Sequence, residues 1–185
     1  MALITTPGAV DADSYASLVE ADAYHAAHLW ATTWDAASVD RKEAALRMAT
    51  RLLDRMPRAW TGAVETETQG LRWPRSGMLT RDGYEIAAGT IPPDLKDAEA
   101  EFARQLLAED RTEDNSALAS DLQSLKAGPV TLTFARKDGE RLALERRDSL
   151  EAMVPEAVIG LLVPSWLLDV REEDEDWTGF VFEAD

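Results

Sequence analysis

Apolar residues recur at helical spacing in three segments of the chain. A capping box from Ser17 to Glu20 predicts a first helix that runs to about Leu29, and Ser38, a preferred N-cap residue, begins a second helix that ends near Met56, before Pro57. The second helix has the strongest pattern, at positions Ala45, Leu46, Ala49, Leu52, Leu53 and Met56.

A third helix is predicted to begin at Ile91-Pro92-Pro93-Asp94, because proline is tolerated in a first turn and aspartate suits the positive end of the helix dipole. Its expected buried face consists of Leu95, Ala98, Phe102 and Leu106. A polar stretch, residues 109–115, follows it.

Between the second and third helices, residues 58–90 have no sustained period and contain five glycines and Pro74. This pattern predicts a long surface loop with one short turn near Glu65 to Gln69. Long loops in compact domains tend to be functional or to be pinned by large anchors, and Leu71, Trp73 and Pro74 are the expected anchor.

After about residue 119 the apolar period changes to two, with Val130, Leu132 and Phe134 alternating with polar residues. We therefore expect a β-hairpin over about 120–145, with turns at Ala127-Gly128-Pro129 and Asp138-Gly139, and a closing helix over about 153–163. The predicted fold class is mainly α (α+β): one domain, 1–168, of three to four main helices, and an acidic C-terminal tail, 169–185.

Composition narrows the possible functions. The chain has a formal net charge of -16 and no cysteine, which disfavours tight phosphate binding and excludes thiolate chemistry. It contains no GxxxxGK[ST], GxGxxG or GxSxG motif, and no apolar run approaches the length of a membrane span. His25 and His28 have the spacing of two neighbours on a helix, but packed or half-exposed histidines are the simpler interpretation. We expect no enzyme activity, cofactor, metal or membrane attachment.

Charged residues form two stripes at helical spacing. Arg47, Arg51, Arg55 and Arg58 would share one side of the second helix and its end, and Asp94, Asp97 and Glu101 one side of the third. In a monomer these are most simply solvated faces. In a ring, a basic face on one subunit could meet an acidic face on the next, so both stripes are candidate interface residues.

The segment Gly70-Leu-Arg-Trp-Pro-Arg-Ser-Gly77 holds the one cluster that could bind nucleic acid: Trp60 and Trp73 with Arg58, Arg72 and Arg75. The alternative is that Leu71 and Trp73 anchor the loop while a neighbouring arginine stacks on the indole or pairs with a carboxylate. The acidity of the whole chain favours the anchor.

The order of four segments resembles a family of tailed-phage head–tail connector, or adaptor, proteins, which are often labelled DnaT-like single-stranded DNA-binding proteins. The segments are the run from Ser14 to Tyr24, Lys42 to Leu46, Leu71 to Gly77, and Ile91-Pro92 before a helix. The resemblance covers roughly residues 2–107.

This resemblance implies a helical adaptor that forms a dodecameric ring in the neck of the virion, after assembly in the host bacterial cytoplasm. Such a ring binds the portal protein on one side and a stopper or tail-completion protein on the other, and genomic double-stranded DNA passes through its lumen without sequence-specific binding. The alternative is a single-stranded DNA-binding, DnaT-like replication accessory protein.

Overall fold

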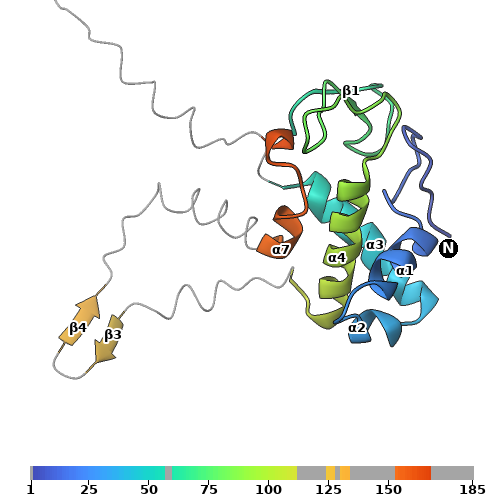
Figure 1. Ribbon diagram of the computed structural model, residues 1–185. Coiled ribbons are helices and arrows are strands. Elements are labelled where there is room, and N and C mark those ends of the chain that lie inside the picture. Colours follow the sequence, from blue (N-terminus) through green and yellow to red (C-terminus); the bar gives the residue numbers. More distant parts are fainter. Residues whose placement is uncertain (1, 57–59, 112–123, 128–129, 134–152, 168–185) are drawn as a thin grey trace, which may run out of the picture.

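The computed structural model describes residues 2–56, 60–111, 124–127, 130–133 and 153–167. Two long helices, α3 (Val39–Asp54) and α4 (Pro93–Ala108), pack side by side at the centre of the fold (Figure 1). Three short helices, α1 (Leu18–Ala26), α2 (Thr32–Asp35) and α7 (Glu156–Ile159), also contact α4. Because so many elements touch it, α4 is the axis of the described fold.

The helix starts follow the local sequence. Ser17 caps α1 in a reciprocal capping box with Glu20, and the Ser38 hydroxyl accepts the backbone N–H of Arg41 at the start of α3. Helix α4 begins with Pro92 at the N-cap and Pro93 in the first turn. The predicted starts of all three helices are therefore confirmed.

The predicted end of the first helix is wrong. Helix α1 stops at Ala26 rather than near Leu29, and a separate one-turn helix, α2, occupies part of the expected connection. The N–H of Trp30 bonds to the His28 ring at 3.0 Å instead of continuing the helical ladder. This side-chain acceptor turns the backbone away before α2 begins.

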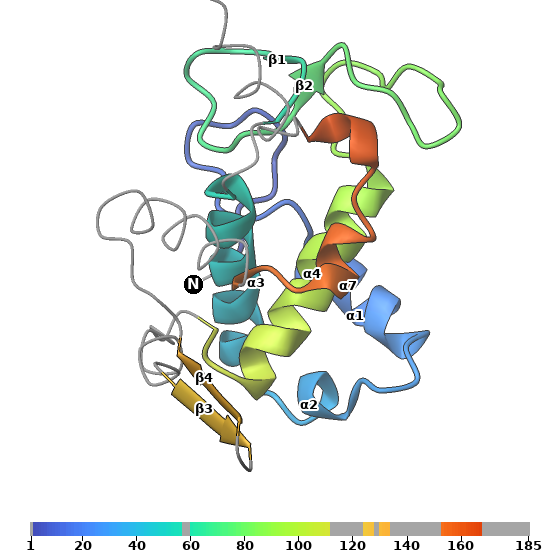
Figure 2. The same cartoon turned by 90° about the vertical axis from the view of Figure 1, so that its left-hand side faces the viewer.

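The long loop contains one small pair of strands that the sequence did not predict. Strands β1 (Ala63–Val64) and β2 (Arg75–Ser76) are antiparallel, with Ala63 opposite Ser76. Gly62 precedes β1 with φ of 63°, and a side chain there would lie 2.4 Å from the Ser76 carbonyl oxygen. Figures 1 and 2 both show the β1 region at one end of the α3–α4 pair and α2 at the other.

The predicted hairpin is confirmed in type. Strands β3 (Ser124–Ala127) and β4 (Val130–Thr133) pair antiparallel, with Leu125 opposite Leu132. Several predicted features lie outside the described residues: the turn at Asp138-Gly139, the tail 169–185, and the positions of Pro57 and Arg58.

The closing helix is shorter than predicted. Helix α7 has one turn and is followed by the 3₁₀ turn η1 (Pro164–Trp166). Pro155 disfavours helical backbone at Val154 and is the N-cap of α7, and the helix ends at its C-cap, Gly160, four residues before Pro164 begins η1. Helical and short antiparallel elements together confirm the broad α+β class.

One hydrophobic core joins these elements. Leu95, Ala98 and Phe102 of the predicted α4 face are buried, whereas Leu106 is partly buried. The predicted α3 positions Ala45, Leu46, Ala49 and Leu53 are also buried, and Leu52 and Met56 are partly buried. In the described residues no helix is long and apolar enough to cross a membrane.

Candidate functional site

Trp73, the central residue of the expected loop anchor, is buried. Trp73 is 1% exposed and lies between two other tryptophans, with ring centroids 5.8 Å from Trp60 and 5.0 Å from Trp166. Both contacts are T-shaped, an arrangement that aromatic pairs favour. Pro74 is buried beside it and Leu71 is partly buried. The tryptophan of the Gly70–Gly77 segment therefore faces the core and offers no surface on which a base could stack.

Arg75 is buried as well, and its contacts are ones that the sequence analysis did not consider. Its guanidinium donates hydrogen bonds to four backbone carbonyls. The Nε–O distance to Thr61 is 2.6 Å, and the Nη2–O distance to Gly62 is 2.9 Å. The other two acceptors are Arg72 and Trp60. A fork of five N–H donors suits this arrangement, in which Arg75 holds both sides of the loop together.

Arg72 lies on the surface next to this anchor. Its side chain is exposed, and its backbone N–H donates to Asp54 at 3.1 Å. The Tyr15 hydroxyl also donates to Asp54, and burial raises the pKa of that carboxyl. Of the predicted nucleic-acid cluster, Arg72 is the one arginine that the described chain leaves exposed, since Arg58 is outside the described residues.

The sequence analysis missed a fully buried carboxylate, that of Glu99. Glu99 on α4 is fully buried, and its carboxylate accepts hydrogen bonds from the Ser14 and Thr50 hydroxyls and from the N–H of Ala16, each at 2.6 Å. Burial raises its pKa to about 7, although these three donors oppose the shift. The only signal in the sequence was a glutamate next to the apolar positions of the third helix. Such a position does not show whether the carboxylate is buried and hydrogen-bonded or lies at the edge of the core.

The two histidines lie in different environments. His25 is buried against Trp34, with ring centroids 4.4 Å apart, and its Nε2 bonds to the Ala100 carbonyl at 3.1 Å. Burial lowers the pKa of His25, so the ring is neutral at physiological pH. His28 instead faces Glu101 at 3.7 Å. Among the described residues no group of three or more metal-binding side chains converges.

The basic stripe separates into two parts. Arg47 lies 2.6 Å from Asp13 and 3.6 Å from Glu43, so it is paired inside the chain. Arg51 and Arg55 are exposed near the end of α3.

The acidic stripe divides in the same way. Glu101 is 5% exposed, and Arg104 and Gln105 bind its carboxylate. Asp94 and Asp97 are half-buried, and burial followed by the nearby Asp94 charge raises the pKa of Asp97. Four of the predicted interface residues, Arg51, Arg55, Asp94 and Asp97, thus remain accessible for a partner.

Two further surface features stand out. Leu29 and Trp30 are 82% and 71% exposed, next to each other in the chain. A cavity of about 330 Å³ lies beside β1, and it is lined by Asp54, Val64, Thr66, Glu67, Gln69, Gly70, Leu71 and Arg72.

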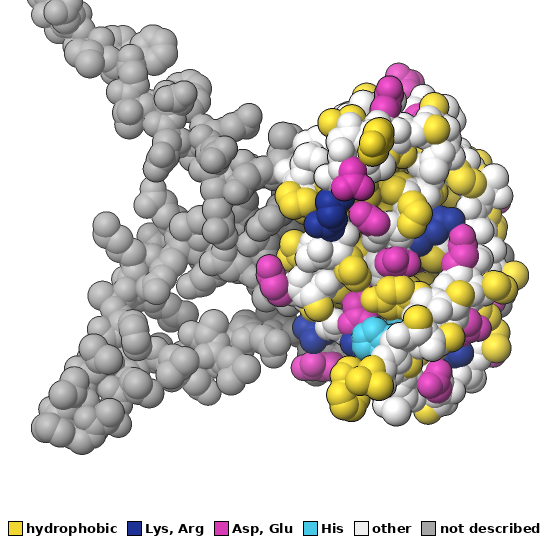
Figure 3. Space-filling model, in the orientation of Figure 1, with side chains coloured by type: hydrophobic (Ala, Val, Ile, Leu, Met, Phe, Trp, Pro, Cys, Tyr) yellow, Lys and Arg dark blue, Asp and Glu magenta, His cyan; other side chains and the backbone are white. Residues whose placement is uncertain are grey.

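On the face shown in Figure 3, Lys and Arg side chains are scattered among Asp and Glu, and hydrophobic side chains project beside the visible histidine.

Comparison with known proteins gives one result. A family described as "Putative DnaT-like ssDNA binding protein" matches residues 1–164. No curated protein and no solved structure matches the chain. The match includes every described helix up to the start of η1 and the segment that holds the buried Trp73 and Arg75. The chain belongs to this DnaT-like family.

Proposed function

We propose that this protein is a structural adaptor of a long-tailed bacteriophage. It forms a ring, dodecameric by resemblance, at the joint between head and tail, where it binds the portal on one side and a stopper or tail-completion protein on the other. Genomic double-stranded DNA passes through the ring without sequence-specific contacts. The adaptor carries out no chemistry, and its role depends on protein–protein surfaces.

The observation that carries this proposal is the inward orientation of the tryptophan–arginine cluster. Trp60 and Trp73 are 8% and 1% exposed, and the Arg75 guanidinium donates to four backbone carbonyls. Single-stranded DNA binders need exposed aromatic rings along a basic groove, because stacking and phosphate contacts supply their affinity. In this chain the same residue types stabilise a loop.

The accessible surface fits protein contacts better. Trp30, Leu29 and Tyr84 are large side chains that water surrounds in the monomer, with Tyr84 74% exposed. Tryptophan and tyrosine are enriched at the energetic centres of protein interfaces. A net charge of -16 also opposes retention of DNA inside a channel, which favours a component through which DNA must slide.

The family description favours a second function, binding of single-stranded DNA. In that case the exposed arginines Arg51, Arg55 and Arg72 would contact phosphates, and the exposed Tyr84 would stack on a base. This alternative predicts an affinity that falls steeply with salt, since each phosphate contact releases counterions.

Two measurements distinguish the functions. Negative-stain microscopy of the full chain, alone and with its portal protein, is expected to show rings of uniform diameter. Fluorescence anisotropy with a labelled single-stranded oligonucleotide at physiological salt is expected to show no stable complex. Sub-micromolar, salt-sensitive binding together with monomeric particles would contradict the adaptor role.

A further inference from the structure

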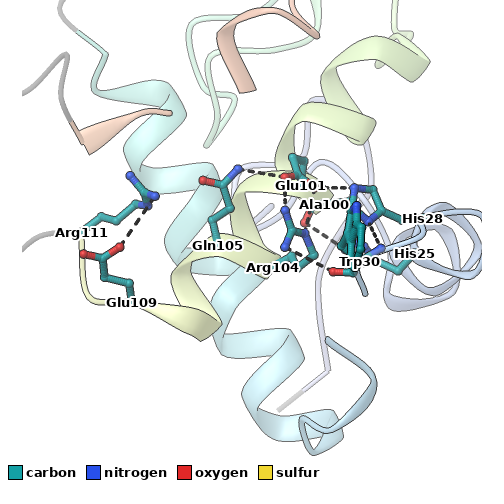
Figure 4. Close-up of polar contacts among 9 residues, drawn as sticks. All are labelled: His25, His28, Trp30, Ala100, Glu101, Arg104, Gln105, Glu109 and Arg111. Carbon is teal, nitrogen blue, oxygen red and sulfur yellow. Dashed lines mark hydrogen bonds and ion pairs between the residues drawn. The ribbon is translucent and has the colours of Figure 1, made fainter. Parts of the chain in front are cut away.

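The backbone of Trp30 is fixed on both sides although its side chain is exposed. Its N–H donates to Nδ1 of His28 at 3.0 Å, and its carbonyl accepts from Nη1 of Arg104 at 3.4 Å (Figure 4). Arg104 is itself held by two contacts to Glu101. This polar clamp holds the backbone from which the exposed indole of Trp30 projects.

A clamped, exposed tryptophan has the properties of a binding anchor. Ordering a loop costs free energy on association, and a backbone that is already held by hydrogen bonds lowers that part of the cost. Leu29, the preceding residue, is 82% exposed and adds a second apolar side chain. We call this pair the knob. Two adjacent large apolar side chains facing water favour burial against another surface.

The cavity beside β1 is a half-open hollow with a mainly polar lining, and it offers apolar and charged contacts to the knob. Val64 and Leu71 supply apolar contacts, and the exposed Arg72 supplies a cation for the face of an indole. The Glu67 carboxylate at the same cavity can accept the indole N–H. With a volume of about 330 Å³, the cavity has room for one indole ring system.

The knob and the cavity lie at opposite ends of the molecule. The knob directly precedes α2, and the cavity follows β1; Figures 1 and 2 show these elements at opposite ends of the α3–α4 pair. A projection and a hollow on different surfaces of one chain cannot meet within that chain, but they can meet between copies. Such a contact is heterologous and repeats from subunit to subunit, closing into a ring when the rotation allows.

We propose that the Leu29–Trp30 knob of one subunit inserts into the Val64–Leu71–Arg72 cavity of a second copy of this chain. The inference rests on the proposed ring-forming function and gives that function a specific subunit contact. A different protein as the occupant is a separate outcome of the test below.

The test uses two variants of the full chain. Trp30→Ala removes the knob and keeps the cavity, whereas Thr66→Trp fills the cavity from an exposed lining position and keeps the knob. By sedimentation velocity, each variant alone is expected to lose at least tenfold in self-association and to run as a monomer. An equimolar mixture is expected to form a heterodimer, because one intact knob and one intact cavity remain. Val19→Ala, which truncates an apolar side chain that is 77% exposed and belongs to no proposed interface, is the control and should assemble like the wild type.

Cross-linking provides a second readout that does not depend on weakened assembly. Because the chain has no cysteine, Leu29→Cys and Thr66→Cys each introduce the sole thiol of their chain. Mixing the two under mild oxidation is expected to give a disulfide-linked dimer between unlike chains. Circular dichroism confirms that every variant is folded.

Three outcomes would overturn the contact: normal assembly of Trp30→Ala, a Trp30→Ala and Thr66→Trp mixture that stays monomeric, or a monomeric wild type. The first two leave the adaptor function standing, provided that wild-type rings form, and assign Trp30 to another surface or protein. If the wild type forms no rings even with the portal and binds single-stranded DNA, the proposed function fails as well.

Discussion

Trp73 is the side chain on which the loop from Trp60 to Ile91 is anchored. A glycine-rich segment buries little apolar area of its own, and this one gains stability by placing an indole between Trp60 and Trp166. Arg75 adds four hydrogen bonds to carbonyls that would otherwise lose their partners. The loop is thus ordered by two residues of one short segment.

Truncation of the Trp73 side chain should destabilise the folded chain. Trp73→Ala is expected to lower the free energy of unfolding by roughly 3 to 5 kcal/mol, because the indole is 1% exposed and its removal leaves a cavity. Chemical denaturation measures the change. Tyr84→Ala, at a site that is 74% exposed, is the control and should change the stability by less than about 0.5 kcal/mol. A Trp73 variant as stable as that control would contradict the anchor role.

Glu99 makes stability depend on pH near neutrality. Its pKa rises from 4.5 in the unfolded chain to about 7 in the folded one, so folding favours the protonated carboxyl. The stabilisation from this group is fully present below about pH 4.5 and is lost as the pH rises through 7. Between pH 5 and 9 the loss is on the order of 3 kcal/mol.

Glu99→Gln should remove this dependence. The Ser14 and Thr50 hydroxyls have alternative acceptors in the carbonyls of Ala16 and Leu46, at 2.7 and 3.0 Å, so both can turn to accept the amide of glutamine. We expect the variant to gain stability relative to the wild type as the pH rises from 5 to 9, measured by urea denaturation across that range. A constant difference between the two proteins would show that Glu99 does not titrate there.

At the scale of elements, periodicity and caps predicted α3 and α4 well, since both are long and carry strong local start signals. The short elements were not predictable in the same way. The end of α1 depends on the His28 ring taking the Trp30 N–H, and β1–β2 depends on Arg75 and Trp73 closing a loop across a dozen residues. These contacts are set by tertiary structure, so no periodic pattern of apolar residues in the sequence indicates them.

The contacts of the candidate surface residues could not be predicted from the sequence either. Spacing placed Arg47 and Glu101 on charged stripes, but it could not show that Asp13 and Arg104 already pair with them. Glu99 and the cavity beside β1 arise from segments distant in sequence, so neither had a local signature. The tryptophan anchor was predictable because a large apolar residue in a glycine-rich loop has few alternatives to burial.

The accessible parts of the stripes give a test at this scale. Reversal of Arg51 and Arg55 to glutamate should leave a folded chain by circular dichroism yet abolish rings in negative stain, because like charges then repeat around the circle. Asp94→Arg and Asp97→Arg in the same chain should partly restore them. Arg47 and Glu101 are left unchanged, since their partners lie within the subunit. Normal rings from the arginine reversals would make both stripes solvated faces.

At the scale of the whole molecule, the core is closed by residues far apart in the chain. Tyr15 near the start and Trp166 near the end of the described chain belong to one cluster with Trp73. The Trp166 indole N–H donates to the Leu79 carbonyl at 2.7 Å, and the Trp166 carbonyl accepts from the Thr61 N–H at 2.8 Å. The last described segment therefore holds the loop onto the helices, although α7 itself has a single turn.

Removal of that segment should unfold the molecule. A chain ending at Ala152 loses five buried apolar side chains, Val154, Val158, Leu162, Val163 and Trp166. At roughly 1.5 to 3 kcal/mol for each, their loss is comparable to the total stability of about 5 to 15 kcal/mol that is usual for a domain. We expect the truncated chain to lose its cooperative thermal transition and its near-ultraviolet circular dichroism. A chain ending at Leu168, which keeps all five, is the control and should melt within a few degrees of the full protein. A cooperative transition in the shorter chain would mean that α3, α4 and the loop form a stable core without this closing segment, and that Trp73 is held by Trp60 and Arg75 alone.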